Sequence, residues 1–93
     1  MNGEAALRTA IDLIYGDRHD SYGDAISDFT ATAEIWTALL RRKGYLKDGA
    51  QLDAHSVAIM MIALKLSREA HMHKDDNCVD IAGYTGLAMD VAK

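Results

Sequence analysis

Charged residues near the end of the chain have the types and spacing that could do chemistry. On a helical wheel at 100° per residue, Asp76 and Asp80 fall inside the apolar stripe of their own segment, in line with Leu87. An ionised carboxylate without a partner is too costly to bury in a protein core. We therefore expect both acids to be paired with bases, with a metal ion or with a ligand.

Two basic residues are placed to be those partners. Arg68 continues an apolar row of the preceding segment, and Lys65 lies to one side of that row. Few residues separate the two segments, so we expect them to fold back as an antiparallel hairpin. Lys65 and Arg68 would then approach Asp76 and Asp80, whose charges the N-terminus of the last helix also favours.

Two interpretations of this charge cluster remain open. One is a salt-bridge network that locks the hairpin, since ion-pair networks are often purely structural. The other is a small-molecule site. Asp76 and Asp80, four residues apart on one helix face, could hold Mg²⁺ together with substrate phosphates. Lys65 and Arg68 would suit the phosphate oxygens.

A polar stretch over residues 16–23 is predicted to be a loop, because it is rich in residues that favour turns. Arg18 and Tyr22 are the residues there that could reach a ligand. The alternative is a surface loop in which Tyr22 packs on the core. A long charged loop between helices is costly unless it is used or tied down.

Weaker candidates surround the expected end of the third helix. His71, His73, Asp75 and Asp76 suggest zinc, but a His-x-His pair is poorly spaced on a helix and no thiol ligand is evident. We favour a capping and solvating role for the histidines. Cys78 has no recognisable catalytic partner, which favours a packed cysteine.

The elements that must position these residues are all predicted to be helices. They are expected at 4–15, at 25–43, from a cap at Asp53 to about 71, and from a cap at Asp75 or Asp76 to about 92. Residues 57–66 read VAIMMIALKL, apolar almost all round, which predicts that the third helix is the most buried. We expect one all-α domain over residues 1–93, folded as a four-helix antiparallel bundle.

Composition narrows the class of function. The chain has 93 residues and a net charge of -4, which argues against a partner such as duplex nucleic acid. It has no apolar run long enough to cross a membrane and no signal-peptide pattern. Its single cysteine fits a reducing, cytoplasmic location, the host cytoplasm if a phage encodes it. A chain this short makes a thin core, so we expect a homodimer.

The sequence resembles a family of short all-α proteins common in phage genomes. The resemblance runs from about residue 10 to 92 and rests on GDRHDSYGD at 16–24, ALKLSRE at 63–69 and DNCVDIAGY at 76–84. Position 78 departs from it, since a large aromatic residue is expected there. The residues that match the shared pattern are Arg18, Tyr22, Gly23, Phe29, Trp36, Lys65, Arg68, Asp76, Asp80, Gly83 and Tyr84.

That family is more distantly similar to the MazG-like all-α NTP pyrophosphatases. This similarity implies a dimer, with Mg²⁺ on Asp76 and Asp80 and phosphates on Lys65 and Arg68. It also implies that Arg18, Tyr22 and Tyr84 belong to the same ligand site. The MazG-like signature has a Glu-Glu-x-x-Glu cluster, whereas residues 25–43 here offer only two acids, neither at that spacing. The implied ligand-binding residues are Arg18, Tyr22, Lys65, Arg68 and Tyr84.

The sequence is therefore compatible with three functions. The first is a nucleotide-binding protein that acts as an Mg²⁺-dependent nucleotide pyrophosphohydrolase. The second is a non-catalytic phage counter-defence protein, which sequesters a nucleotide signal or binds and inhibits a host defence protein. The third is a structural or assembly role. Whether the protein is an enzyme stays open at this point.

Overall fold

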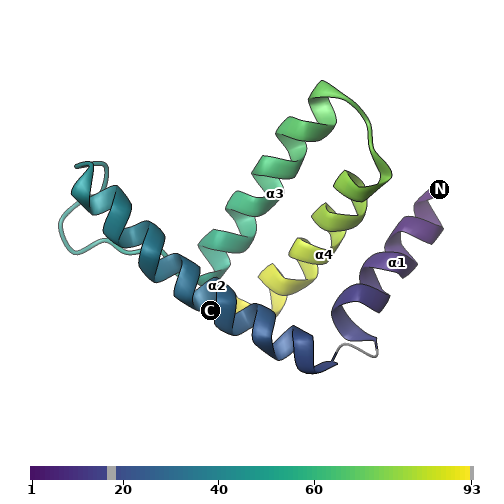
Figure 1. Ribbon diagram of the computed structural model, residues 1–93, viewed down its shortest axis with the longest axis horizontal. Helices are drawn as coiled ribbons and strands as arrows, with labels where there is room; N and C mark the ends of the chain where they lie inside the picture. Colours follow the sequence, from purple (N-terminus) through teal and green to yellow (C-terminus); the bar gives the residue numbers. More distant parts are fainter. Residues whose placement is uncertain (17–18, 93) are drawn as a thin grey trace.

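Four helices make up the described chain (Figure 1). The computed structural model describes residues 1–16 and 19–92, with side chains described for 1–16 and 25–92. The helices are α1 (Gly3–Tyr15), α2 (His19–Arg42), α3 (Ala54–His71) and α4 (Asp75–Val91). The described residues contain no strand, so the all-α prediction is confirmed.

Short polar side chains start two of the helices. The Asn2 side chain accepts a hydrogen bond from the Ala5 N–H at the start of α1, at 2.8 Å. Asp53 does the same for the Ser56 N–H at the start of α3, also at 2.8 Å, which confirms the predicted cap. Helix α4 differs, because its N-cap is Lys74, which makes no side-chain capping bond. The predicted caps for α4 instead lie in its first turn.

Helix α2 starts earlier than predicted. It begins at His19 and takes in most of the stretch that was expected to be a loop. Polar residues and one glycine lower helix propensity, but Gly costs only about 1 kcal/mol relative to Ala in a helix. The chain contains no proline that could stop the helix. The long loop predicted over 16–23 is therefore wrong.

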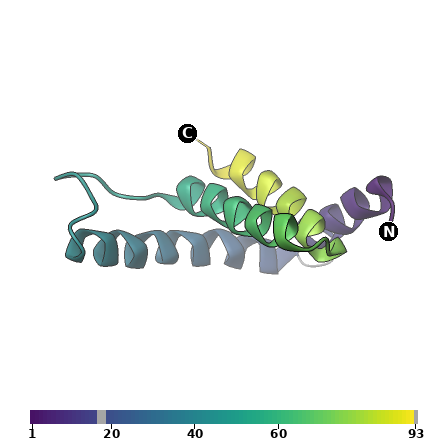
Figure 2. The same cartoon turned by 90° about the horizontal axis from the view of Figure 1, so that it is seen from above.

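The helices pack around α4 (Figures 1 and 2). Helices α3 and α4 form the expected antiparallel hairpin, and α1 lies on the other side of α4. Helix α1 runs parallel to α4, because Tyr15 Oη donates to Asp90 Oδ2 at 2.6 Å while the Met1 amino group lies 3.5 Å from Asp75 Oδ2. Helix α2 crosses this layer, and its second half extends beyond it (Figure 2). The predicted antiparallel arrangement thus holds for α3 and α4 but not for α1 and α4.

The core is thin. The molecule measures 44 × 33 × 18 Å, and its buried apolar side chains are mostly Ala and Val with one Leu: Ala10, Ala33, Val57, Ala58, Val79, Leu87 and Ala88. Helix α4 contributes more buried residues than α3, in which Met60 is 42% and Leu66 55% exposed. The prediction that the third helix is the most buried is wrong for the single chain. Helices of the described chain are all too short or too polar to cross a bilayer.

Candidate functional site

An ion pair joins the facing sides of α3 and α4. Lys65 Nζ lies 2.8 Å from Asp80 Oδ2, and the two side chains are 13% and 34% exposed. The antiparallel hairpin brings the two together, as the sequence predicted. Partial burial makes this pair stronger than a fully exposed one, because water screens it less.

A cationic groove runs from this pair to the turn between the two helices. Its volume is about 520 Å³. Arg68 is exposed and, in the described part of the chain, has no carboxylate partner. Three basic side chains and a histidine face a single carboxylate in this groove, so its local charge is positive although the whole chain is acidic. The lining residues are Lys65, Ser67, Arg68, His71, Met72, Lys74, Asp76 and Asn77.

Asp76 and Arg68 face this groove and not the core. Both are exposed, which corrects the expectation that they lie on core-facing rows. The helical wheel predicted on which side of its helix each residue lies. At this end of the hairpin, however, that direction leads to the groove, where both side chains are exposed. Neither side chain therefore needs a partner to offset burial.

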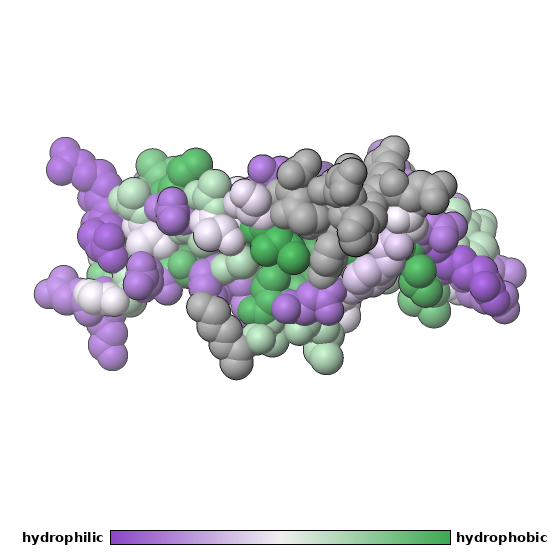
Figure 3. Space-filling model, turned by 90° about the horizontal axis from the view of Figure 1, so that it is seen from below, coloured by the Kyte–Doolittle hydropathy of each residue, from purple (hydrophilic) through white to green (hydrophobic). Residues whose placement is uncertain are grey.

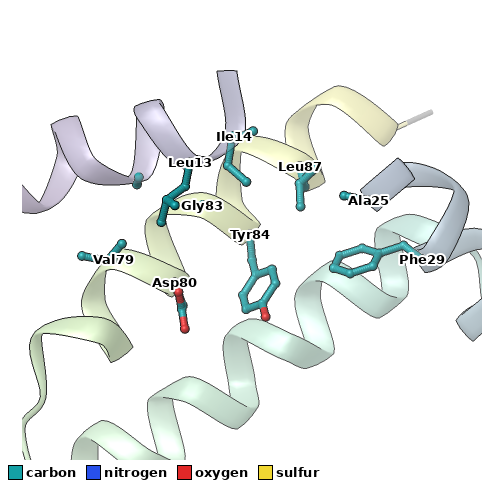
Figure 4. A pocket seen from close by; sticks show the side chains of 10 residues that line it. Leu13, Ile14, Ala25, Phe29, Val79, Asp80, Gly83, Tyr84 and Leu87 are labelled. Atoms are coloured by element: carbon teal, nitrogen blue, oxygen red, sulfur yellow. The ribbon is translucent and has the colours of Figure 1, made fainter. Parts of the chain in front are cut away.

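An apolar pocket of about 240 Å³ lies beside the same ion pair (Figure 4). Asp80 sits at its edge, and the pocket is otherwise lined by apolar and aromatic side chains of α1, α2 and α4. Phe29 and Tyr84 form its aromatic side, with ring centroids 5.9 Å apart and planes tilted by 34°. Asp80 and Tyr84 both point away from α1 in Figure 4. The Lys65–Asp80 pair thus connects an aromatic pocket with a cationic groove.

Asp76 and Asp80 do not gather a larger set of metal ligands. Among the described residues, neither belongs to a group of three His, Cys, Asp or Glu ligand atoms close enough to share an ion. Asp80 is also engaged by Lys65. Mg²⁺ is commonly bound by one or two carboxylates together with substrate phosphates, so Mg²⁺ on Asp76 and Asp80 stays a prediction. Arg18 lies outside the described residues, and the Tyr22 side chain lies outside the described side chains.

A second polar cluster at the α3–α4 turn was missed by sequence reasoning. Glu69 Oε1 accepts hydrogen bonds from the Lys74 N–H at 3.0 Å and from Asn77 Nδ2 at 3.2 Å. Its other oxygen, Oε2, contacts His73 Nδ1 and lies 3.6 Å from Cys78 Sγ. Glu69 thereby ties the end of α3 to the first residues of α4. The spacing of four between Glu69 and His73 was the available sequence signal.

The pKa values in this second cluster follow from its contacts. The hydrogen bond from His73, followed by that from the Lys74 N–H, lowers the pKa of Glu69 from 4.5 to about 2. The same Glu69 contact raises the pKa of His73 above 6.5. Desolvation, and then the nearby Glu69 charge, raise the pKa of the Cys78 thiol. Cys78 is exposed, so the expectation of a packed cysteine is wrong.

Comparison with known proteins places the chain in a family. The model of a domain of unknown function, DUF6378, matches residues 5–92. The chain belongs to the DUF6378 family. "Gene 55 protein" of Mycobacterium phage L5 is 40% identical to this DUF6378 protein over 83 residues, which cover 87% of this chain and 48% of the relative. The chain thus spans about half the length of the curated relative that it matches. No solved structure matches it.

The family assignment supports the predicted resemblance to a family of phage proteins. A relative in a mycobacteriophage fits the expected family of phage proteins. Similarity to the MazG-like pyrophosphatases stays a prediction.

Proposed function

We propose that this DUF6378 protein binds a nucleotide or another phosphorylated small molecule, with its phosphates in the cationic groove. The observation that carries the proposal is the group of basic side chains around Arg68. Lys65, Arg68 and Lys74 line one groove opposite a single acid, Asp76. A planar guanidinium with no carboxylate partner among the described residues suits bidentate binding of phosphate oxygens.

The aromatic pocket is the proposed place for the base. Phe29 and Tyr84 offer ring faces on which a base can stack, and stacking contributes about 1–3 kcal/mol per base in single-stranded nucleic-acid binders. Asp80 at the pocket edge can accept hydrogen bonds from a base or sugar. Arg18 and Tyr22 remain proposed contributors to the ligand site.

Binding without hydrolysis is the form of this function that the geometry favours. Mg²⁺-dependent hydrolysis needs carboxylates that are available to the ion. Asp80 is instead paired with Lys65 at 2.8 Å, and the described residues near Asp76 add no third ligand. A MazG-like pyrophosphohydrolase is therefore the second candidate, and Asp76 and Asp80 would be its metal ligands.

A binder of this kind suits a phage protein. Holding an intact nucleotide signal would lower its free concentration in the host cytoplasm, which is the counter-defence role proposed from the sequence. Inhibition of a host defence protein through the acidic surface is the alternative within the same role.

The test is equilibrium binding to a panel of NTPs, dNTPs and signalling nucleotides, with and without Mg²⁺, followed by analysis of the recovered nucleotide. We expect stoichiometric retention of an intact nucleotide. Arg68→Ala should weaken binding about tenfold or more, because it removes a charge-assisted contact of about 1.5–3 kcal/mol. Arg42→Ala is the matched control, since Arg42 is an exposed arginine at the end of α2, outside the groove.

Three results would change the conclusion. Pyrophosphate release that disappears in Asp80→Ala would establish the enzyme. Equal loss of affinity in Arg68→Ala and Arg42→Ala would show that only general charge matters. Absence of binding to the whole panel, with Lys65→Ala only lowering the melting temperature, would leave the ion pair as a structural element.

We also propose that the protein dimerises through the faces of α2 and α3. Trp36, Leu39, Leu40 and Met60 line an apolar groove of about 180 Å³, and Leu39 is 58% exposed. Figure 3 shows apolar patches open to solvent on one face, between more hydrophilic ends. A helix that is apolar almost all round is normally covered. A second copy of this chain is the occupant that would cover α3 and complete the thin core.

A further inference from the structure

We propose that Glu69, His73 and Cys78 form a binding site for Zn²⁺ at the α3–α4 turn, separate from the phosphate site. These are the only three His, Cys, Asp or Glu residues among those described whose ligand atoms all lie within 4.8 Å of one another. Carboxylate oxygen, imidazole nitrogen and thiolate sulfur are all ordinary zinc ligands.

The spacing of the three ligand atoms suits one ion. With Zn–S near 2.3 Å and Zn–N and Zn–O near 2.1 Å, tetrahedral geometry sets neighbouring ligands about 3.5 Å apart. Cys78 Sγ and Glu69 Oε2 are already 3.6 Å apart. His73 Nδ1 is in contact with the same Oε2 atom and would move back slightly to admit the ion.

The outer contacts already orient two of the three ligands. Ligand histidines usually donate their second ring N–H to a carboxylate or carbonyl. His73 Nε2 lies 3.2 Å from Asp75 Oδ1, which leaves Nδ1 for the ion. Glu69 Oε1 is held by the Lys74 N–H and by Asn77 Nδ2, which leaves Oε2. Each of these ligands therefore presents one atom and has the other fixed.

The mixed ligand set favours zinc over the harder cations. Mg²⁺ and Ca²⁺ prefer oxygen ligands throughout, whereas a thiolate and an imidazole favour Zn²⁺ and similar transition metals. On binding, the Cys78 thiol loses its proton to solvent and the Zn–S bond forms. His73 likewise releases the Nδ1 proton that it shares with Glu69 when it is protonated. Three protein ligands leave the fourth position of the ion for water.

Position in the fold gives this site a second property. Glu69 belongs to α3, His73 to the turn and Cys78 to α4. An ion held by all three would tie the two helices of the hairpin together. Zn²⁺ should therefore raise the melting temperature, since it binds the folded chain better than the unfolded one.

Co²⁺ is the probe for the test, because a cobalt–thiolate bond gives a near-ultraviolet charge-transfer band. We expect the purified protein to show this band at one equivalent of Co²⁺ and to lose it when Zn²⁺ is added. Cys78→Ser should abolish the band. Asp75→Asn should lower Zn²⁺ affinity about 10–100-fold, as loss of an outer-shell partner does.

His73→Gln and His71→Gln form the matched pair. The two histidines are both exposed and two residues apart, but only His73 belongs to the cluster. We expect His73→Gln to remove Zn²⁺ binding and His71→Gln to keep it, with both variants checked for helical content. Equal affinity in the two variants, or a cobalt spectrum without the thiolate band, would overturn the proposal. Nucleotide binding does not enter this test, so the two proposals can fail separately.

Discussion

The Lys65–Asp80 pair is the residue-scale feature with the clearest energetic consequence. Lys65 is 13% exposed, so its removal leaves the Asp80 carboxylate half-buried without its base. Exposed pairs contribute about 0.2–1 kcal/mol and fully buried pairs lose about 3–5 kcal/mol when broken from one side. A pair of intermediate exposure should lie between these limits.

We therefore predict that Lys65→Met lowers the free energy of unfolding by about 1–2 kcal/mol. Asp80→Asn should cost a similar amount, because it leaves the less exposed Lys65 ammonium without its carboxylate. A double-mutant cycle measured by urea unfolding should give a coupling energy of about 1 kcal/mol. Additive effects would contradict a direct interaction between the two side chains.

The Glu69–His73 pair predicts how stability depends on pH. The pKa of Glu69 is lowered from 4.5 to about 2, so its contribution is present above pH 4.5 and is lost as the pH falls through 2. The pKa of His73 is raised above 6.5, so its contribution is present below pH 6.5 and is lost as the pH rises through the folded value. The pair should stabilise the fold most between about pH 4.5 and 6.5.

Melting temperatures across pH, without added metal, test this window. His73→Gln should remove most of the decline on the alkaline side, and Glu69→Gln most of the decline on the acid side. His71→Gln is the control and should follow the wild type. A wild-type profile that is flat between pH 6 and 9 would contradict the histidine assignment.

Sequence reasoning at this scale succeeded where a local pattern was enough. Helix periodicity and a short turn sufficed to bring Lys65 next to Asp80. They could not reveal that Glu69 reaches the start of α4, because that contact depends on the path of residues 72–74 between the helices. The exposure of Asp76 depended in turn on where neighbouring helices end, which no wheel describes.

At the scale of elements, two glycines of α4 show how closely α1 approaches. A Cβ on Gly83 would lie 3.5 Å from Ile14 Cγ1, an ordinary contact. A Cβ on Gly86 would lie 3.0 Å from Tyr15 Oη, which donates to Asp90 at 2.6 Å. The first position has room for a methyl group, whereas the second would disturb a hydrogen bond between the helices.

We predict opposite results for the two alanine variants. Gly83→Ala should stabilise the protein by about 0.5–1 kcal/mol, since alanine has the higher helix propensity and the methyl group fits. Gly86→Ala should gain nothing or destabilise, because the Tyr15 hydroxyl must shift. Thermal unfolding of the two variants decides this, and a stabilising Gly86→Ala would contradict the close approach of α1.

Helix boundaries were predictable where capping residues mark them, as Asn2 and Asp53 show. The start of α2 was not predictable from the sequence. A run of polar residues is typical of a loop, but the free energies of helix and coil differ little for such a run, so it can also form a helix. The direction of α1 was not predictable either. Its parallel course beside α4 follows from how α2 crosses the layer, which is a property of the assembled chain.

At the scale of the whole molecule, the apolar groove between α2 and α3 predicts an oligomer. We expect a dimer by analytical ultracentrifugation, with a mass twice 10.2 kDa. Leu39→Asp should shift the equilibrium to the monomer, because it places a charge in a groove that the second copy would cover. Met89→Asp is the control, since Met89 is 74% exposed and lies on α4, outside that groove. A monomer at all concentrations would refute the dimer.

The central place of α4 also sets where backbone amides should exchange with solvent most slowly. It has α3 on one side and α1 on the other, and its residues Val79, Gly83, Leu87 and Ala88 are buried. Local opening there must break both contacts, so deuterium uptake should be slowest between residues 79 and 88. The second half of α2 projects beyond the layer and should exchange quickly in a monomer. Slow exchange of the backbone amides of residues 35–42 would thus indicate that a second copy of the chain covers this part of α2.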